Sequence, residues 1–402
     1  MKLLKKAFDS CKYGLAIFAG VMAVAAVNKT LFTPSPRRYV MYLLDGKIGF
    51  TSRTLVGTVL NLFIKEYTPQ KLEVFSVAVT IAAMFIFSMY IGYFIHKAQK
   101  EDRRHLGVFI ILISFVVLNL CGLKSQYDVF WSLLVLLSLL FYQNKWLRWL
   151  LPLLCFAGLM INPAYLLTFL PFVFAMMLSD ISQKGEKGVS KSKTALFAAS
   201  FGVSFVSSVY FFFFETRYLK MNREQFYEYL FKKMDFTGID TQLTYEYVDG
   251  YFFNLFEGKD ISGAWQRLQE LFKYNVVKYD VLLLLSVLIA VPMLIFFVAV
   301  WRDCLKQLPK EREKGDYTKW IYRMNMIYIL MLLPALVGSP DVSRFLGHYV
   351  LAQLLLLCYH IQNKNPHVMP AIRSRLDWLT KRPHYAVIFV AVCIVVLGVA
   401  LS

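Results

Sequence analysis

Long apolar runs separated by shorter polar segments form the dominant pattern along this chain. Several of the runs reach the length of about 17–25 residues that crosses a bilayer as a helix. The pattern predicts an all-α polytopic membrane protein, with residues 1–402 forming a single membrane domain of about 11 transmembrane helices. The predicted spans are 13–28, 72–95, 106–123, 128–142, 148–161, 164–179, 195–214, 281–300, 324–338, 349–361 and 385–401.

Two of the connecting segments are much longer than a simple turn requires. The first, 29–71, contains apolar residues at helical spacing between Thr51 and Lys65, which predicts an amphipathic helix on the membrane surface. Pro69 is expected to end this helix, because proline disrupts a helix interior. We expect the segment to form a first outer loop with a surface helix.

The second long segment, 215–280, alternates charged and aromatic residues. It is too apolar for a disordered linker, so we expect amphipathic helices packed over the outer face. Arg217–Lys233 and Ile261–Lys278 have helical character, and Asp249-Gly250 marks a turn between them. This large outer loop is predicted to cover a cavity.

Composition supports the membrane interpretation, and the distribution of the positive charge indicates topology. Hydrophobic residues make up 58% of the chain, against roughly 45–50% in soluble domains. The net charge of +18 is concentrated in alternate loops, as the positive-inside rule requires, so it predicts topology and contact with the lipid bilayer, and not nucleic-acid binding. The predicted location is a bacterial plasma membrane, with the N-terminus cytoplasmic and the C-terminus outside.

The cysteines and the N-terminal segment add two expectations. None of the six cysteines lies in the long outer loops or shows zinc-ligand spacing, so neither a disulfide framework nor a zinc site is predicted. The basic start is followed by an apolar run without a small-residue cleavage site, which favours a retained first span over a cleaved signal.

The segment Tyr39–Gly57 contains the strongest candidate for chemistry. Asp45 and Lys47 flank Gly46, and Arg53 follows eight residues after Asp45. Gly46 and Gly49 permit a tight turn that could direct Asp45 and Arg53 toward one point. A carboxylate can take a proton from a hydroxyl, and a guanidinium can bind a phosphate. The alternative interpretation is an ordinary juxtamembrane loop with a surface ion pair.

Other polar residues fall on the same predicted face. Ionisable groups at the edge of the hydrocarbon region cost free energy unless they are paired or hydrated, which favours function. Taken singly, each could instead be a paired or snorkelling structural residue. Asn162-Pro163 could likewise mark a partly unwound cavity wall or a simple hairpin turn. The set comprises Arg37, Arg38, Lys124, Asp128, Asn162, Tyr165, Glu246, Asp249, Asp341, Arg344 and His348.

No glycine-rich nucleotide loop, nucleophile elbow or zinc-protease motif is present, so phosphate recognition would depend on Arg and Lys. We expect transfer from a phosphate-linked lipid donor, with Asp45 as the catalytic base. The candidate donor-phosphate ligands are Arg53, Arg344, Arg38 and Lys47. The candidate supporting residues are Asp341, Asn162, Tyr165, His348 and Lys124.

The chain resembles the GT-C family of integral-membrane glycosyltransferases in its long first outer loop with an acid and surface helix, its span number and its large loop between spans 7 and 8. Asp45 matches the position of the family's first-loop catalytic acid. The resemblance implies a polyprenyl-phosphate-linked sugar donor, a glycan or glycolipid acceptor, a cavity under 215–280 and, in some members, a divalent cation such as Mg or Mn. Many members have two acids close together, whereas Asp45 has no acidic neighbour before Glu66.

Three alternatives remain open from the sequence. An O-antigen-type polymerase or ligase would use a lipid diphosphate oligosaccharide instead of a lipid monophosphate sugar. A lipid-linked sugar flippase or transporter would place polar residues along the inner halves of its spans, which look nearly free of charge. An accessory membrane protein would perform no chemistry.

Overall fold

The computed structural model describes residues 2–27, 41–99, 127–182, 190–234, 280–308, 318–328 and 342–382, together with 384 and 388. Within these ranges the regular structure is helical. The described residues form two isolated β-bridges and no strand. The all-α prediction is confirmed for this part of the chain.

The described residues form helices along the whole length of the chain. In order they are α1 (Lys2–Val27), α3 (Leu55–Leu60), α4 (Pro69–Gln99), α6 (Asp128–Tyr142), η1 (Leu147–Leu150), α7 (Leu151–Ile161), α8 (Tyr165–Thr168), α9 (Leu170–Ser182), α10 (Lys191–Phe213), η2 (Glu215–Tyr218), α11 (Arg223–Lys233), α15 (Asp280–Lys306), α16 (Thr318–Ile327), α18 (Val342–Gln362) and α19 (Val368–Thr380).

Three described segments are long and apolar enough to cross a membrane: Pro69–His96, Lys191–Phe213 and Phe345–Gln362. They lie in α4, α10 and α18. The predicted span 128–142 coincides with α6. The predicted span 106–123 lies outside the described residues, as does 385–401 apart from residue 388, and eleven spans remains a prediction.

Two predicted boundaries and one predicted loop are corrected. The surface helix expected over 51–65 is shorter, because α3 ends at Leu60 and Asn61 turns its side chain to Asp45. Pro69 begins α4 instead of ending a helix, since its fixed φ and missing N–H suit a first turn. The segment 362–384, a predicted loop between the predicted spans 349–361 and 385–401, contains α19.

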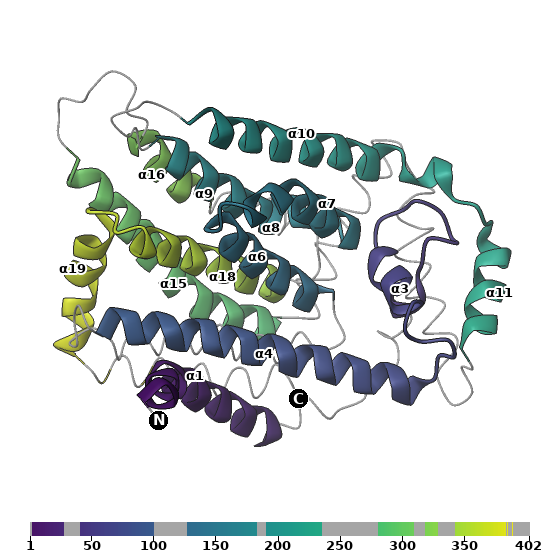
Figure 1. Cartoon of the computed structure of the whole chain (residues 1–402), viewed down its shortest axis with the longest axis horizontal. Helices are drawn as coiled ribbons and strands as arrows, with labels where there is room; N and C mark the ends of the chain where they lie inside the picture. The colour runs from purple at the N-terminus through teal and green to yellow at the C-terminus, as the bar shows by residue number, and fades with distance from the viewer. Residues whose placement is uncertain are drawn as a thin grey trace.

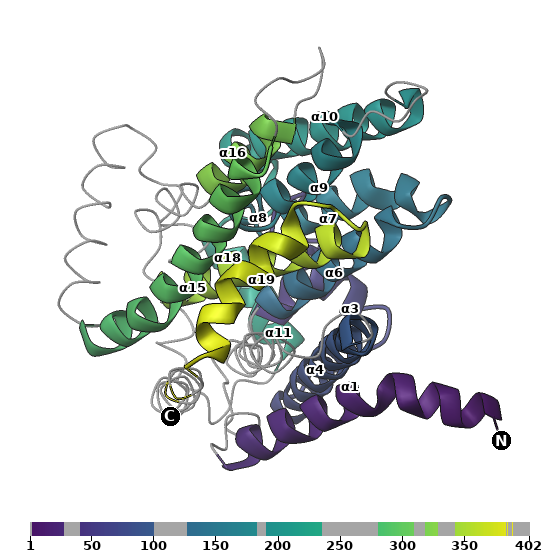
Figure 2. The same ribbon diagram turned by 90° about the vertical axis from the view of Figure 1, so that its left-hand side faces the viewer.

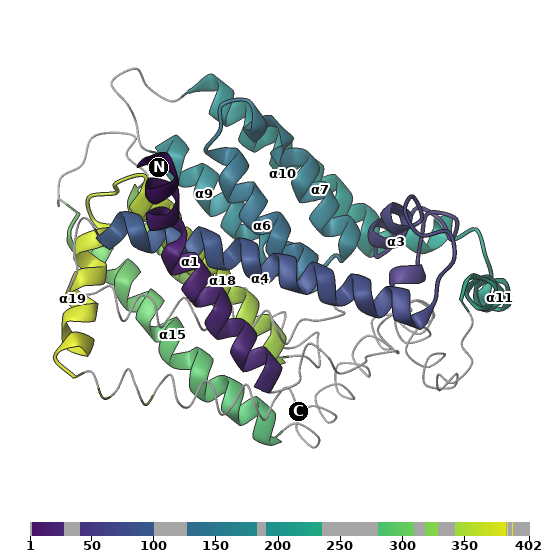
Figure 3. The ribbon, with the colours of Figure 1, turned by 60° about the horizontal axis from the view of Figure 1, so that its bottom comes forward.

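The helices form a bundle whose two ends carry different elements. Figure 1 shows α10 along one side, α6 and α18 in the middle, and α4 with α1 on the other side. Figures 1 and 3 both place α3 and α11 at one end of the bundle, while α19 lies across the opposite end. Figure 2 looks onto that opposite end, with α19 in front. Two segments far apart in sequence, 41–68 and 215–234, therefore share one end.

We call residues 41–68 and 215–234 together the cap, because hydrogen bonds join them. The N–H of Ser52 donates to Oε2 of Glu215 over 2.7 Å. The N–H of Lys220 donates to the Ile48 carbonyl over 2.9 Å. Isolated bridges pair Gly49 with Leu219 and Tyr67 with Met234. The two outer segments predicted separately from the sequence thus form one structure in their described parts.

Gly57 is the point of closest approach inside the cap. A Cβ placed on Gly57 would lie 2.1 Å from the carbonyl oxygen of Leu44 and 2.7 Å from that of Tyr42. A Cβ on Gly46 would have Oγ1 of Thr58 as its nearest neighbour, at 3.6 Å. Only a residue without a side chain therefore lets α3 pack on the chain that leads into Asp45.

We expect Gly57→Ala to destabilise the protein by about 1–3 kcal/mol, because the added methyl group overpacks rigid backbone. Thermal unfolding of the purified protein in detergent measures the effect. Gly46→Ala is the matched control and should change the unfolding temperature little. Equal behaviour of the two variants would contradict the close packing of α3 on this segment.

Candidate functional site

Asp45 lies in a tight turn at the centre of the cap. The N–H of Ile48 donates to the Asp45 carbonyl over 3.1 Å, and the N–H of Lys47 donates to Oδ1 of Asp45 over 2.9 Å. Aspartate commonly stabilises turns by bonding to the backbone two residues ahead. The carboxylate is buried, with the residue only 1% exposed.

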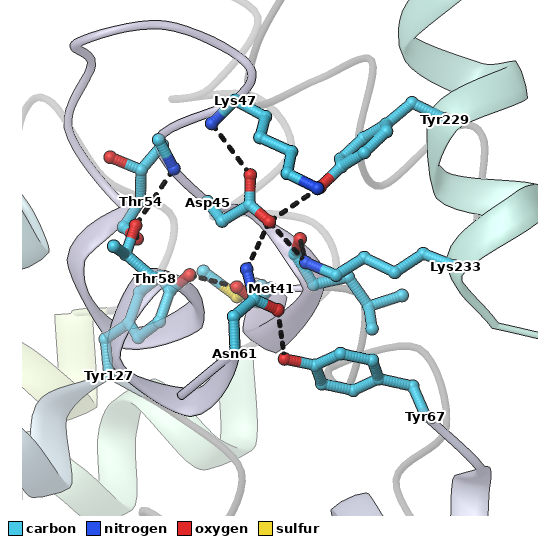
Figure 4. A network of polar contacts seen from close by, with 12 residues as sticks. Met41, Asp45, Lys47, Thr54, Thr58, Asn61, Tyr67, Tyr127, Tyr229 and Lys233 are labelled. Atoms are coloured by element: carbon cyan, nitrogen blue, oxygen red, sulfur yellow. Dashed lines mark hydrogen bonds and ion pairs between the residues drawn. The ribbon is translucent and has the colours of Figure 1, made fainter. Parts of the chain in front are cut away.

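The second carboxylate oxygen of Asp45 accepts three further contacts (Figure 4). The Tyr229 hydroxyl donates over 2.6 Å, and Nζ of Lys233 lies at 2.7 Å. The side-chain amide of Asn61 donates to the same oxygen and accepts from the Tyr67 hydroxyl. Asn61 directly follows α3, whereas Tyr229 and Lys233 lie in α11, so the site forms only when the two halves of the cap meet.

The ammonium group of Lys233 is held by several groups at once. Nζ donates to the Leu43 carbonyl over 2.6 Å as well as to Asp45. It lies 4.9 Å from the centre of the Tyr67 ring and 5.5 Å from that of Tyr229, distances at which aromatic rings attract cations. Its side chain is 11% exposed. Lys233 and Asp45 therefore form a largely buried ion pair.

The sequence of α11 explains how two of its residues reach Asp45. Asn222 and Gln225 form a reciprocal capping box that fixes the start of the helix. Phe226 and Leu230 are buried, whereas Tyr229 and Lys233 follow on the neighbouring stripe. Because residues four apart share a helix face, Tyr229 and Lys233 point to the same carboxylate.

The electrostatics of the site favour an ionised Asp45. Burial alone raises the pKa of Asp45, but the hydrogen bonds from Lys233, Tyr229, Lys47 and Asn61 outweigh it and hold this pKa below its ordinary value. Burial lowers the pKa of Lys233; the contact with Asp45 opposes that change, and the charge of Lys47 adds to it. The charge of Lys47 therefore acts on the ammonium partner of Asp45.

The pKa of Asp45 predicts a specific loss of stability in acid. Because this pKa is lower in the folded chain, the ionised carboxylate stabilises the folded state. The stabilisation is complete at pH values above the ordinary aspartate pKa of about 3.9. It is lost as the pH falls through the lower pKa of the folded state. Thermal unfolding recorded at decreasing pH should show a smaller decline for Asp45→Asn than for the wild type. An identical decline in both proteins would contradict the stabilising role of the charge.

The structure does not join Asp45 to Arg53 as the sequence suggested. The hydrogen bonds and the ion pair of Asp45 go to the four partners above. Arg53 adopts a positive φ of 68°, its N–H donates to the Met160 carbonyl over 2.7 Å, and its carbonyl accepts from the Tyr127 hydroxyl over 2.8 Å. Its backbone anchors the cap to the end of α7. Lys47 lies beside the site and is exposed.

Asn162 and Tyr165 form the hairpin turn between α7 and α8. Oδ1 of Asn162 accepts from the N–H of Ala164 over 3.1 Å, and the carbonyl of Asn162 accepts from the N–H of Tyr165 over 3.0 Å. The buried Tyr165 ring packs where Gly158 leaves room for it. The structure favours the simple hairpin turn, with structural roles for both residues.

His348 pairs with Asp128 and does not contact Asp45. Nε2 of His348 lies 3.2 Å from Oδ1 of Asp128, and both residues are buried between α18 and α6. The His348 ring packs against Trp131 and Phe169. This pair connects two central helices of the bundle.

The remaining predicted residues cannot be placed at the site. Arg344 lies in the first turn of α18, and its side chain is outside the described part of the chain. Arg38, Lys124 and Asp341 lie outside the described residues. Their assignment as phosphate-binding or supporting residues remains a prediction.

The donor set around Asp45 does not suit a divalent cation. Among the described residues, no group of three or more His, Cys, Asp or Glu side chains comes together. Both oxygens of Asp45 already accept hydrogen bonds, and one of them contacts an ammonium group, whereas Mg²⁺ needs several oxygen ligands.

An open apolar groove runs along α10 beside α8 and α9. Its volume is about 250 Å³. Toward the cap, the Tyr210 hydroxyl of α10 donates to the Phe50 carbonyl over 2.6 Å, and the Phe50 ring packs against Phe211. The same helix therefore lines the groove and contacts the loop that contains Asp45. The groove is lined by Leu166, Leu170, Phe174, Phe201, Ser204, Phe205, Ser208, Val209, Phe212 and Phe213.

Sequence reasoning missed the partners of Asp45, above all Lys233. The predicted helix over 217–233 placed Tyr229 and Lys233 on one face, but nothing in the sequence related that face to a residue 188 positions earlier. Asn61 and Tyr67 were also missed, because 51–65 was expected to be a continuous surface helix. Comparison of the chain with protein-family models, with curated proteins and with solved structures gave no match.

Proposed function

We propose that this chain is a membrane glycosyltransferase that transfers a sugar from a polyprenyl-phosphate-linked donor to a glycan or glycolipid acceptor. The proposal places the chain in a bacterial plasma membrane with the cap on the outer face. The observation that carries it is a buried, ionised Asp45 with the cations Lys233 and Lys47 beside it, held at one end of an apolar helical bundle.

The chemistry needs a base for the acceptor and positive charge for the leaving group. The carboxylate of Asp45 takes the proton of the acceptor hydroxyl while the oxygen of that hydroxyl bonds to the anomeric carbon of the sugar. The bond from that carbon to the phosphate oxygen breaks, and its electron pair stays on the phosphate. Cationic side chains stabilise the charge that develops there, and Lys47 and Lys233 are the nearest candidates in the described cap.

The apolar groove along α10 supports a lipid-linked donor. Phenylalanine rings on α10 line a surface suited to a branched hydrocarbon chain, and α10 ends at the cap. A donor chain lying in this groove would bring its phosphate toward the loop that contains Asp45. A soluble nucleotide sugar would have no use for such a groove.

Purified protein in proteoliposomes, supplied with a panel of undecaprenyl-phosphate sugars and glycolipid acceptors, tests the proposal. We expect the release of undecaprenyl phosphate together with a glycosylated acceptor. Turnover of lipid diphosphate oligosaccharides instead would assign the chain to the polymerase or ligase class. Movement of an unreacted lipid-linked sugar between leaflets, without transfer, would assign it to the flippases. Either result would contradict the glycosyltransferase proposal.

A further inference from the structure

In the observed arrangement, the carboxylate of Asp45 is surrounded by hydrogen-bond donors. Oδ2 accepts from Asn61, Tyr229 and Lys233, and Oδ1 accepts from the N–H of Lys47. The residue is almost completely buried. Because these groups cover the buried carboxylate, an acceptor hydroxyl can reach Asp45 only after one of them moves.

The four donors differ in how easily each can leave. The N–H of Lys47 belongs to the same turn as Asp45, and Asn61 is held in place by Tyr67. Tyr229 is fixed to the middle of α11. Lys233 lies at the end of that helix on a long, rotatable stem, and it alone among these four donor groups is charged in its contact with Asp45. Its ammonium group also contacts the Leu43 carbonyl and two aromatic rings, so only a strongly charged partner such as a phosphate can draw it away.

A second cation lies close enough to Lys233 to act on it. Lys47 is exposed, and its charge is felt at Lys233. Two cations next to one carboxylate leave a net positive charge, which attracts an anion. A phosphate in contact with both ammonium groups would compete directly with Asp45 for Lys233.

We propose that Lys233 is a substrate-controlled switch, whose ammonium group moves from Asp45 to the donor phosphate when the donor binds. The inference rests on the proposed function and names the regulation of the same site. Without donor, Lys233 occupies the carboxylate. With donor, Lys233 neutralises the leaving phosphate, and Asp45 is released to accept the proton of the incoming hydroxyl.

This coupling makes the base available only when the leaving group is in place. The loss of the Lys233 contact also raises the affinity of Asp45 for a proton, because the strongest favourable interaction of its charged form has gone. One movement of one side chain therefore prepares both halves of the reaction. Lys232, which pairs with Glu228 on the exposed side of α11, takes no part.

Binding of farnesyl phosphate to purified variants in detergent tests the switch, with farnesol and inorganic phosphate as comparison ligands. The variants are Asp45→Asn, the double variant Asp45→Asn with Lys233→Met, and Lys232→Met as the matched control. Since Asp45→Asn ends the competition for Lys233, it should bind farnesyl phosphate about tenfold more tightly than the wild type.

The double variant should lose this gain, because the phosphate then lacks its cation, and Lys232→Met should bind like the wild type. Farnesol affinity should stay equal in all four proteins. Tighter binding of farnesyl phosphate than of inorganic phosphate assigns the ligand to a lipid carrier, whereas equal affinity would overturn that assignment. If the Asp45–Lys233 pair were merely structural, Asp45→Asn would bind phosphate no more tightly than the wild type, or more weakly. Either result would overturn the switch. The absence of farnesyl phosphate binding in every variant would overturn it too.

The two proposals fail in different experiments. If the donor panel gives no transfer while phosphate affinities follow the expected order, the glycosyltransferase proposal falls and the competition for Lys233 stands. If transfer occurs but Asp45→Asn gains no phosphate affinity, the switch alone is wrong.

Discussion

Replacing Asp45 by asparagine is expected to reduce sugar transfer by about 10²–10⁴-fold, the usual contribution of a positioned general base. Asparagine preserves the size of the side chain and one acceptor oxygen, but it cannot take up the proton of the acceptor hydroxyl. The loss should appear in the maximal rate at saturating donor. Release of undecaprenyl phosphate from proteoliposomes, in the presence of the acceptor that supports transfer by the wild type, measures this rate.

Asp180→Asn provides a matched control for the loss of a carboxylate. Asp180 also pairs with a lysine and a tyrosine, since Nζ of Lys193 lies 2.7 Å and the Tyr142 hydroxyl 2.8 Å from its Oδ2. It lies near the end of α9 and pairs with the start of α10, away from the cap. Transfer by Asp180→Asn should remain near the wild-type rate. Full activity of correctly inserted Asp45→Asn would show that another group serves as the base.

Replacing Lys233 by methionine is expected to destabilise the fold by about 3–5 kcal/mol, because it leaves the Asp45 charge buried without its cation. Methionine retains most of the apolar stem, so the loss reports on the charge more than on packing. Denaturation of the purified protein in detergent, followed by tryptophan fluorescence, gives the free energy of unfolding. Lys232→Met should change it by no more than about 0.5 kcal/mol, because the side chain of Lys232 is 74% exposed.

The double variant with Asp45→Asn and Lys233→Met identifies the cause of this loss. It removes both charges, so most of the stability lost in Lys233→Met should return. The two single changes should therefore be far from additive. If the double variant were as unstable as the sum of the single changes, the side chains would act independently and the ion pair would not fasten α11 to the rest of the cap.

Much of the fold was readable from the sequence because local rules decide it. The apolar runs that became α4, α6 and α10 are continuous and strongly hydrophobic, and their predicted bounds agree with the helices within a few residues. The position of α3 was recognised but its length was not, since the chain after Leu60 exchanges helical hydrogen bonds for side-chain contacts to Asp45. Likewise α19 depends on packing one face against the bundle, which its polar composition concealed.

For the candidate site, the sequence by itself determined the groups on which the proposed chemistry depends: a lone acid in a glycine-containing turn, between apolar helices, with cations available nearby. Only the tertiary structure decided which cation meets that acid. Arg53 is close in sequence, but its backbone adopts a left-handed conformation and ties the loop to α7. Lys233 is distant in sequence, but α11 packs onto the loop and delivers it. The physical reason is that a buried charge selects its partner by three-dimensional proximity after the helices have packed, and spacing along the chain does not contain that information.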